Sequence, residues 1–371
     1  MVNKHRSMLS ATALALTLCV CGAVATTSSA QTCNLYVSPK GSDSNNGTST
    51  SSPWKTAQHA FSSVHAGQTV CFRHGTYPMH VSSGYNQTLS NSGTSSSWIT
   101  ITNYPGEVAI IEGNTRVQAA YAKFMGTPAT VLDAGLIFDG STTTQQLGLI
   151  DIMYSHDITF DHAEIRKAQY HAGIYQYSGY NIKLIGSYVH DNGRPGYINT
   201  DQGIYWDATT GGGNLIANNV VEHNVSSGIQ FYPSPANVTV EENTVVNNGN
   251  YGMVLYGSQN KVVNNIFAEN GAVANNKQLN IYSGNNHVVD LNVFWSAIAA
   301  LRGFVDGTGQ KVTHSIILDP LFADALGHDY QLLTGSPAID VANQNYTQTV
   351  DKNDLSRGTP PDLGAYENTN Y

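Results

Sequence analysis

Two neighbouring stretches of the chain decide its fold, GIQFYPSPANVTVEENTVVNN (residues 228–248) and GMVLYGSQNKVVNNIFAEN (residues 252–270). Both begin with glycine and an apolar residue, continue through short runs rich in valine, and end in asparagine. The same unit begins earlier, at Gly148, Gly173 and Gly203, and in a weaker form at Leu279. Successive glycine starts lie 25, 30, 25 and 24 residues apart, and self-similarity at such a period is typical of a solenoid.

Aligning the units places like residues in columns. Two columns are apolar: Phe160, Leu184, Ile216, Val240, Val262 and Val289, and Ile165, Val189, Val221, Val245, Phe267 and Phe294. A third column reads Ala163, Ser187, Asn219, Asn243, Asn265 and Asn292. Short β-branched runs with a period of two predict strands, and the asparagine column predicts a turn in which stacked amides bond one another. The sequence therefore predicts a parallel β-solenoid.

The repeats resemble the right-handed parallel β-helix of the pectate-lyase-like superfamily, a scaffold of polysaccharide lyases and glycoside hydrolases. LYVSPKGSDSNNGTSTSSPWKTAQHAF (35–61) and GQTVCFRHGTY (67–77) resemble the N-terminal segment of such secreted proteins. DPLFAD (319–324), YQLLTGSPAID (330–340) and RGTPPDLGAYE (357–367) resemble their C-terminal module. The resemblance implies an all-β, single-stranded right-handed parallel β-helix with an N-terminal helical cap and an irregular C-terminal cap. One scaffold hosts many reactions, so the resemblance specifies the fold and not the chemistry.

The first thirty residues are predicted to be a secretory signal peptide. Residues 4–6 are basic, residues 9–24 are mostly apolar, and the small residues 28–30 precede a cleavage site after Ala30. A lipoprotein signal that ends at Cys19 or Cys21 is the alternative. We therefore expect a secreted or periplasmic protein with no membrane segment after the signal is removed.

The rest of the chain is predicted to form one domain. We expect a signal peptide at 1–30 and a β-helix at 31–371, with an N-terminal cap and lead-in at about 31–80, coils at about 98–300 and a C-terminal cap at about 315–371. Trp54, Ala57, Phe61 and Val64 share one side of a short amphipathic helix, which suits an N-terminal plug. Cys33 and Cys71 remain after export, and without nearby histidines they favour a structural disulfide over a zinc or redox site.

The composition excludes two classes of protein. Seventeen Lys+Arg against 26 Asp+Glu give a net charge of −9, which argues against a nucleic-acid binder. With 12% charged and 41% hydrophobic residues, the chain is not a disordered protein. We expect a monomer whose partner is a polysaccharide.

Ionisable residues gather in two further columns on three consecutive coils. One column holds Arg166, His190 and Glu222, and the next holds Lys167, Asp191 and His223. Because strands of neighbouring coils lie about 4.8 Å apart, we expect these six groups to line one cleft. Local basic residues on an acidic protein suit a polyanionic sugar chain, whereas charges at a solvated turn are the alternative.

A second candidate surface follows the repeat glycines. Its outward positions are predicted to be Ile150, Tyr175, Tyr205, Gln230 and Val254, and then Ile152, Tyr177, Asp207, Tyr232 and Tyr256. Exposed tyrosines beside charges suit sugar rings, and plain cross-strand aromatic packing is the alternative. The longest unit inserts residues 192–202, which bring Arg194, Tyr197 and Asp201 to the same region, and His171 lies in the equivalent turn one coil earlier.

These residues favour cleavage of an acidic, uronate-containing polysaccharide by β-elimination. The reaction needs a neutralised carboxylate and a base for the C5 proton. The predicted catalytic residues are Lys167 as base, His190 or His171 in its place, Arg194 as carboxylate clamp, and Asp191. The predicted substrate-binding residues are Arg166, Tyr175, Tyr205, Asp207, His223 and Gln230. Asp201 and Asp207 are candidate Ca²⁺ ligands, and no organic cofactor is expected.

Three other functions stay open. A glycoside hydrolase would use two carboxylates, such as Asp191 with Glu222 or Asp201 with Asp207. A C5 epimerase would share the first step of the lyase, and a non-catalytic wall or adhesin module would use the tyrosines alone. Family 9 polysaccharide lyases carry an aspartate cluster for Ca²⁺ and a lysine base, and we find no such cluster in this sequence.

Overall fold

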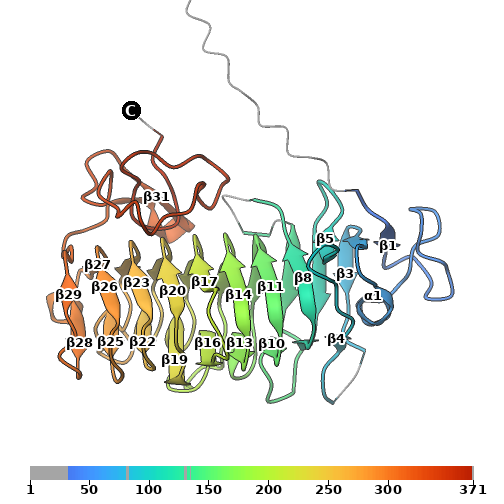
Figure 1. Ribbon diagram of the computed structural model, residues 1–371, viewed down its shortest axis with the longest axis horizontal. Helices are drawn as coiled ribbons and strands as arrows, with labels where there is room; N and C mark the ends of the chain where they lie inside the picture. Colours follow the sequence, from blue (N-terminus) through green and yellow to red (C-terminus); the bar gives the residue numbers. More distant parts are fainter. Residues whose placement is uncertain (1–31, 81–82, 129–131, 134, 370–371) are drawn as a thin grey trace, which may run out of the picture. The chain divides into compact units, whose positions relative to one another are not determined.

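The described chain is a right-handed parallel β-helix. The structure, a computed structural model, describes residues 32–80, 83–128, 132–133 and 135–369 (Figure 1). The predicted signal peptide lies outside the described residues. Each coil contributes one strand to sheet A, then one to sheet B and one to sheet C, and strands of neighbouring coils pair in parallel. The predicted fold class is confirmed.

From β2 (Thr69–Phe72) onward the coils add strands in the order sheet A, sheet B, sheet C, and β1 (Leu35–Val37) pairs with β2 in sheet A. Sheet A contains β1 (Leu35–Val37), β2 (Thr69–Phe72), β5 (Ile99–Asn103), β8 (Ala120–Met125), β11 (His156–Asp161), β14 (Tyr180–Ile185), β17 (Asn214–Ala217), β20 (Val238–Glu241), β23 (Lys261–Val263), β26 (Val288–Asp290) and β29 (Val312–Thr313). Sheet B contains β3 (Gly75–Tyr77), β6 (Ala109–Glu112), β9 (Leu136–Asp139), β12 (Ala163–Arg166), β15 (Tyr188–His190), β18 (Val220–Glu222), β21 (Thr244–Val246), β24 (Ile266–Ala268) and β27 (Val293–Trp295). Sheet C contains β4 (Gln87–Leu89), β7 (Thr115–Val117), β10 (Ile150–Met153), β13 (Ala172–Tyr177), β16 (Gln202–Ala208), β19 (Ile229–Ser234), β22 (Met253–Leu255), β25 (Leu279–Ile281) and β28 (Phe304–Asp306). The remaining elements are α1 (Ala57–Ser63), η1 (Ala299–Leu301), η2 (Ala325–Gly327) and the antiparallel pair β30 (Phe322–Asp324) and β31 (Asp329–Leu332).

The two predicted apolar columns fill the interior, one from sheet A and one from sheet B. Phe160 pairs with Leu184 and Ile165 with Val189, in the predicted register. Every residue of both columns is at most 1% exposed. Burying each such side chain contributes on the order of 1.5–3 kcal/mol, so the stack of coils shares one continuous core.

Asparagine ladders satisfy the turns between the sheets. In the predicted column each side-chain amide donates to the next over 2.9–3.0 Å, from Asn219 through Asn243 and Asn265 to Asn292. A second ladder, which we did not predict, lies between sheets B and C and runs over 2.8–2.9 Å through Asn192, Asn224, Asn248, Asn270 and Gln278. These bonds hold neighbouring coils in register, because each amide of the two ladders is hydrogen-bonded to the next.

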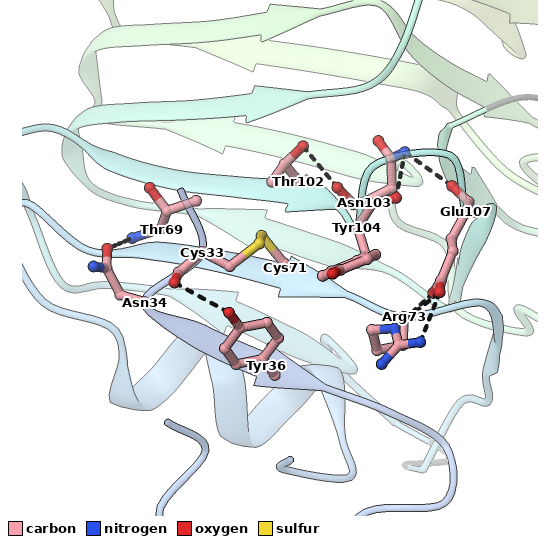
Figure 2. The surroundings of a disulfide bond; sticks show 10 residues. All are labelled: Cys33, Asn34, Tyr36, Thr69, Cys71, Arg73, Thr102, Asn103, Tyr104 and Glu107. Carbon is pink, nitrogen blue, oxygen red and sulfur yellow. Dashed lines mark hydrogen bonds and ion pairs between the residues drawn. A yellow bond between two sulfur atoms is a disulfide. The ribbon is translucent and has the colours of Figure 1, made fainter. Parts of the chain in front are cut away.

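The N-terminal helical cap and the disulfide are present as predicted, but the helix is shorter than expected: Trp54 precedes it and pairs with Val37, and Val64 follows its last residue. Helix α1 is capped by Thr56, and its buried Phe61 packs edge-on against Phe72 with ring centroids 6.2 Å apart. Cys33 is bonded to Cys71 of β2, which ties the chain before β1 to the next strand of sheet A (Figure 2).

Residues 319–369 form an irregular segment, here called the C-terminal cover, that lies on the outer face of sheet B. It is the red-brown part of Figure 1. Tyr330 and Tyr366 of the cover pack in one apolar cluster with Tyr188, Val220 and Val246 of sheet B. No helix in the described ranges is long and apolar enough to cross a membrane.

The structure corrects the predicted orientation of one coil. Ile150 and Ile152 point inward and are at most 1% exposed. Ile150 pairs with Ile174, so Asp151 takes the outward position that pairs with Tyr175. The strand after Gly148 begins one residue later than its counterparts, and a shift of one residue moves every side chain to the opposite face.

Candidate functional site

The outer face of sheet C carries a row of polar and aromatic side chains. Asp151 of β10 pairs with Tyr175 of β13, which pairs with Tyr205 of β16 and then with Gln230 of β19. Gln230 also bonds the amide of Gln202 over 3.1 Å. Sheet C therefore aligns residues that the sequence separates by up to 79 positions, from Asp151 to Gln230.

One group on this face, here called the His171 cluster, contains His171, Tyr175, Tyr205 and Asp207. The His171 ring lies edge-on to Tyr175 with centroids 4.6 Å apart, and 5.2 Å from the ring of Tyr205. The Tyr175 hydroxyl donates to Oδ2 of Asp207 over 2.8 Å. Burial lowers the pKa of His171, although Asp201 and Asp207 oppose the shift. His171 is therefore a neutral imidazole near pH 7, with a lone pair free to accept a proton.

A second group on the same face was missed by the sequence analysis. The Tyr85 hydroxyl donates to Oδ2 of Asp151 over 2.7 Å, and Arg116 lies 5.5 Å above the Tyr85 ring. Burial raises the pKa of Asp151 to about 7, although Tyr85 and Arg116 oppose the shift. Near neutral pH this carboxyl can give or take a proton. An alignment that matches Ile150, and not Leu149, with Ile174 would have placed Asp151 in the outward column beside Tyr175.

Tyrosines extend the face toward the C-terminal coils. Tyr232 and Tyr256 lie edge-on with centroids 5.0 Å apart, and Tyr256 and Tyr282 stack at 4.6 Å. Tyr232 and Tyr282 are exposed. A row of tyrosine rings on a rigid sheet suits the apolar faces of successive sugar rings.

The inserted loop holds Arg194 and Asp201 against one another. Arg194 donates from Nε to Oδ2 over 2.7 Å and from Nη2 to Oδ1 over 2.9 Å, and its guanidinium covers the ring of Tyr197 at 3.5 Å. The Asp201 side chain is 1% exposed. Both carboxylate oxygens are occupied, so Asp201 does not fit a Ca²⁺ site, and calcium stays a prediction from the sequence alone. The same pairing uses Nε and Nη2 of Arg194, so the guanidinium would clamp a substrate carboxylate through its opposite edge, Nη1 with Nη2.

The first predicted charged column is in register but does not line an open cleft. Arg166 pairs with His190 and His190 with Glu222 on sheet B, and all three are buried. Arg166 bonds Asp139 at 2.8 Å and is also paired with Glu164 at 2.7 Å. The alignment of the repeats predicted correctly that these residues share a column. It did not predict the acidic side chains that surround the column, or that the C-terminal cover lies over sheet B.

His190 lies between two carboxylates. Its Nδ1 is 2.8 Å from Asp191, and its Nε2 is 3.2 Å from Glu164. Burial opposes its charge, but these two hydrogen bonds outweigh burial and raise the pKa of His190 to about 9. An imidazolium has no free lone pair at neutral pH, so this arrangement does not favour His190 as the base.

The second charged column occupies the turn between sheets B and C. Lys167, Asp191 and His223 all have positive φ angles of 51–57°, which confirms that they take equivalent places. Lys167 is exposed and makes no ion pair with any other described residue. His223 contacts Glu222 and His328, which follows η2 in the C-terminal cover, and its ring lies 5.5 Å from that of His328.

Comparison with known proteins supports the fold. Residues 35–299 match the family described as Pel9A-like, right handed beta helix region. Protein YwoF of Bacillus subtilis (strain 168), an uncharacterized protein, is 31% identical over 259 residues, which cover 64% of this chain. The present chain spans about half of that relative, 46% of its length.

Two solved structures share the architecture along most of their length. The crystal structure of pectate lyase Pel9A superposes with a TM-score of 0.60 and 16% identity, covering 90% of this chain and 96% of that one. A rhamnogalacturonan lyase superposes with a TM-score of 0.58 and 14% identity, covering 85% and 97%. Identities this low show a common fold and not a common reaction. The chain is a member of the Pel9A-like right-handed β-helix family.

Proposed function

We propose that the protein cleaves an acidic, uronate-containing polysaccharide by β-elimination on the outer face of sheet C. The packing of His171 against the rings of Tyr175 and Tyr205 on this face is the observation that carries the proposal, and the lowering of the His171 pKa by burial supports it. A base for elimination has to be unprotonated at working pH and accessible from the surface. His171 meets both conditions, since its pKa is lowered and its side chain is only partly buried.

In this reaction His171 takes the proton from C5 of the uronate. The electron pair of the broken C5–H bond forms the C4=C5 double bond, and the C4–O glycosidic bond breaks. Tyr205 donates its hydroxyl proton to the departing oxygen. Burial raises the pKa of Tyr205, which keeps the hydroxyl protonated at neutral pH. Tyr175, held by Asp207, positions the imidazole.

Cations and tyrosines around the cluster would bind the polymer. Arg116 lies on the same face of sheet C, and Lys167 lies on the turn that leads into β13. Two cations on an acidic protein would draw uronate carboxylates toward the base. Tyr232, Tyr256 and Tyr282 would stack against successive sugars along the sheet.

We propose that the protein works outside the cytoplasm. The Cys33–Cys71 disulfide is stable in an oxidising compartment, and the predicted signal peptide would direct export. The disulfide and the predicted signal peptide are consistent with a substrate polymer that is too large to enter a cell.

The test is incubation with a panel of uronate polymers while ultraviolet absorbance of unsaturated chain ends is recorded. Absorbance should rise with the wild-type protein, and His171→Gln should lower kcat by at least two orders of magnitude, as expected for loss of a general base. His156→Gln is the matched control, because His156 also packs against a tyrosine ring, Tyr180 with centroids 4.8 Å apart, but on sheet A. Full activity of His171→Gln would contradict the assignment.

A glycoside hydrolase is the second candidate, because burial raises the pKa of Asp151 to about 7, so that a share of this carboxyl keeps its proton near neutral pH and could act as a general acid. Asp207, two coils away on the same face, would be the second carboxylate. New reducing ends without unsaturated products, lost in Asp151→Asn, would favour hydrolysis. Polymer binding without any product would favour a non-catalytic module.

A further inference from the structure

Glu222, His223 and His328 meet where sheet B, the turn that follows it and the C-terminal cover come together. Glu222 ends β18, His223 is the next residue, and His328 directly follows η2. The two histidines are 105 residues apart in sequence, yet their rings lie 5.5 Å apart. Only the folding back of the cover brings them together.

The three side chains direct nitrogen and oxygen atoms that can bind a metal toward one another. Nδ1 of His223 lies 3.1 Å from Oε2 of Glu222, and Nδ1 of His328 lies 3.0 Å from either carboxylate oxygen. One ligand atom from each residue lies within 4.8 Å of the other two. Ligands 2.0–2.2 Å from a tetrahedral ion are separated by roughly 3.3 Å, so small movements of these side chains would admit an ion.

We propose that these three residues bind a divalent transition-metal ion of the zinc type. Two imidazoles and one carboxylate are a common ligand set for such ions, whereas Ca²⁺ and Mg²⁺ prefer oxygen ligands alone. Tyr330 donates its hydroxyl to Oε2 of Glu222 and orients the carboxylate from behind. These three ligands do not include Asp201 or Asp207, the aspartates that were predicted to bind calcium.

An ion can reach this place from solvent. The side chains of His223 and His328 are each 40% exposed, while that of Glu222 is fully buried. His223 also lines a groove of about 520 Å³ together with Ile198 of the inserted loop and Val273. Three protein ligands leave a fourth position for water, and the bound ion would tie the C-terminal cover to the coil.

The inference does not rest on the proposed function, and its test needs no substrate. Metal-free protein, prepared with a chelator, is titrated with ZnCl₂ in a calorimeter, and its thermal unfolding is followed with and without the ion. We expect one zinc ion per chain and a midpoint several degrees higher, because an ion that binds only the folded chain stabilises it. CaCl₂ should produce neither effect.

His223→Ala and His328→Ala should each weaken zinc binding at least tenfold. His314→Ala is the control, since His314 faces a single carboxylate, Asp290 at 2.7 Å, and is 72% exposed. Visible absorbance of Co²⁺ added to the wild-type protein reports nitrogen ligands without any substitution. Absence of zinc binding, an affinity unchanged in both variants, or Co²⁺ bound without nitrogen ligands would overturn the inference.

Discussion

The Tyr175 hydroxyl donates a hydrogen bond of 2.8 Å to Oδ2 of Asp207, and this bond joins β13 to β16 across the His171 cluster. Burial raises the pKa of Asp207, while Tyr175 and His171 act in the opposite direction. The bond fixes the Tyr175 ring against which His171 lies edge-on. A contact between two neighbouring coils thus sets the orientation of the proposed base.

Tyr175→Phe should lower kcat about tenfold with little change in KM. The substitution keeps the ring but removes the hydroxyl that donates to Asp207, so the ring beside His171 is no longer held in place. A hydrogen bond to a charged group contributes about 1.5–3 kcal/mol. Steady-state kinetics on the polymer that gives unsaturated ends measures the effect. Tyr36→Phe, whose hydroxyl bonds Cys33 near the disulfide (Figure 2), should behave as wild type. Equal losses in both variants would contradict the positioning role.

The pH dependence of kcat/KM should show an acid limb that belongs to His171. The base works only when unprotonated, and burial places its pKa below 6.5. Activity should therefore persist at pH 6.5 and fall as the pH is lowered further. A limb centred above pH 7 in the wild-type protein would exclude His171 as the base.

His190 should make stability depend on pH in the alkaline range. Its pKa is about 9 in the folded chain and about 6.5 when unfolded, so its stabilising effect is complete below pH 6.5 and is lost as the pH rises through 9. Urea denaturation should show His190→Gln destabilised by roughly 3 kcal/mol at pH 6, with the gap narrowing toward pH 10. A gap that is constant over this range would show that His190 is not charged in the folded protein.

Removing the disulfide should destabilise the protein by about 4 kcal/mol, because Cys33 and Cys71 close a loop of 38 residues. Cys33→Ser, Cys71→Ser and the double variant should unfold at the same lowered denaturant concentration. Reductant should bring the wild-type protein to that midpoint and leave the double variant unchanged. Activity at low denaturant should survive, since the bridge ties the residues before β1 to β2 of sheet A and does not touch sheet C.

Asn248→Ala should lower stability by about 3 kcal/mol. The amide of Asn248 donates to Asn270 over 2.8 Å and its oxygen accepts from Asn224 over 2.9 Å, so the change leaves several buried groups without a partner. Thermal or urea unfolding measures the loss. Asn345→Ala, at an exposed position of the C-terminal cover, is the matched control and should change little.

The predicted site separated into two groups in the structure. His171, Tyr175, Tyr205 and Asp207 come together on sheet C, whereas Arg166 is buried among carboxylates on the outer face of sheet B. Column alignment could not distinguish these cases, because it reports which residues share a coil position and not what covers them. Asp151 was missed for a simpler reason, a single extra residue before its strand.

The sequence by itself determined the solenoid, its core columns and its first asparagine ladder. In a solenoid each residue contacts the equivalent residue of the next coil, so these contacts appear in the sequence as a regular repeat. The sequence also determined the N-terminal helix and the cysteine pair. Only the tertiary structure decided which outer face stays open. That choice depends on the C-terminal cover, which has no period and meets sheet B through contacts such as His328 with Glu222, separated by more than a hundred residues.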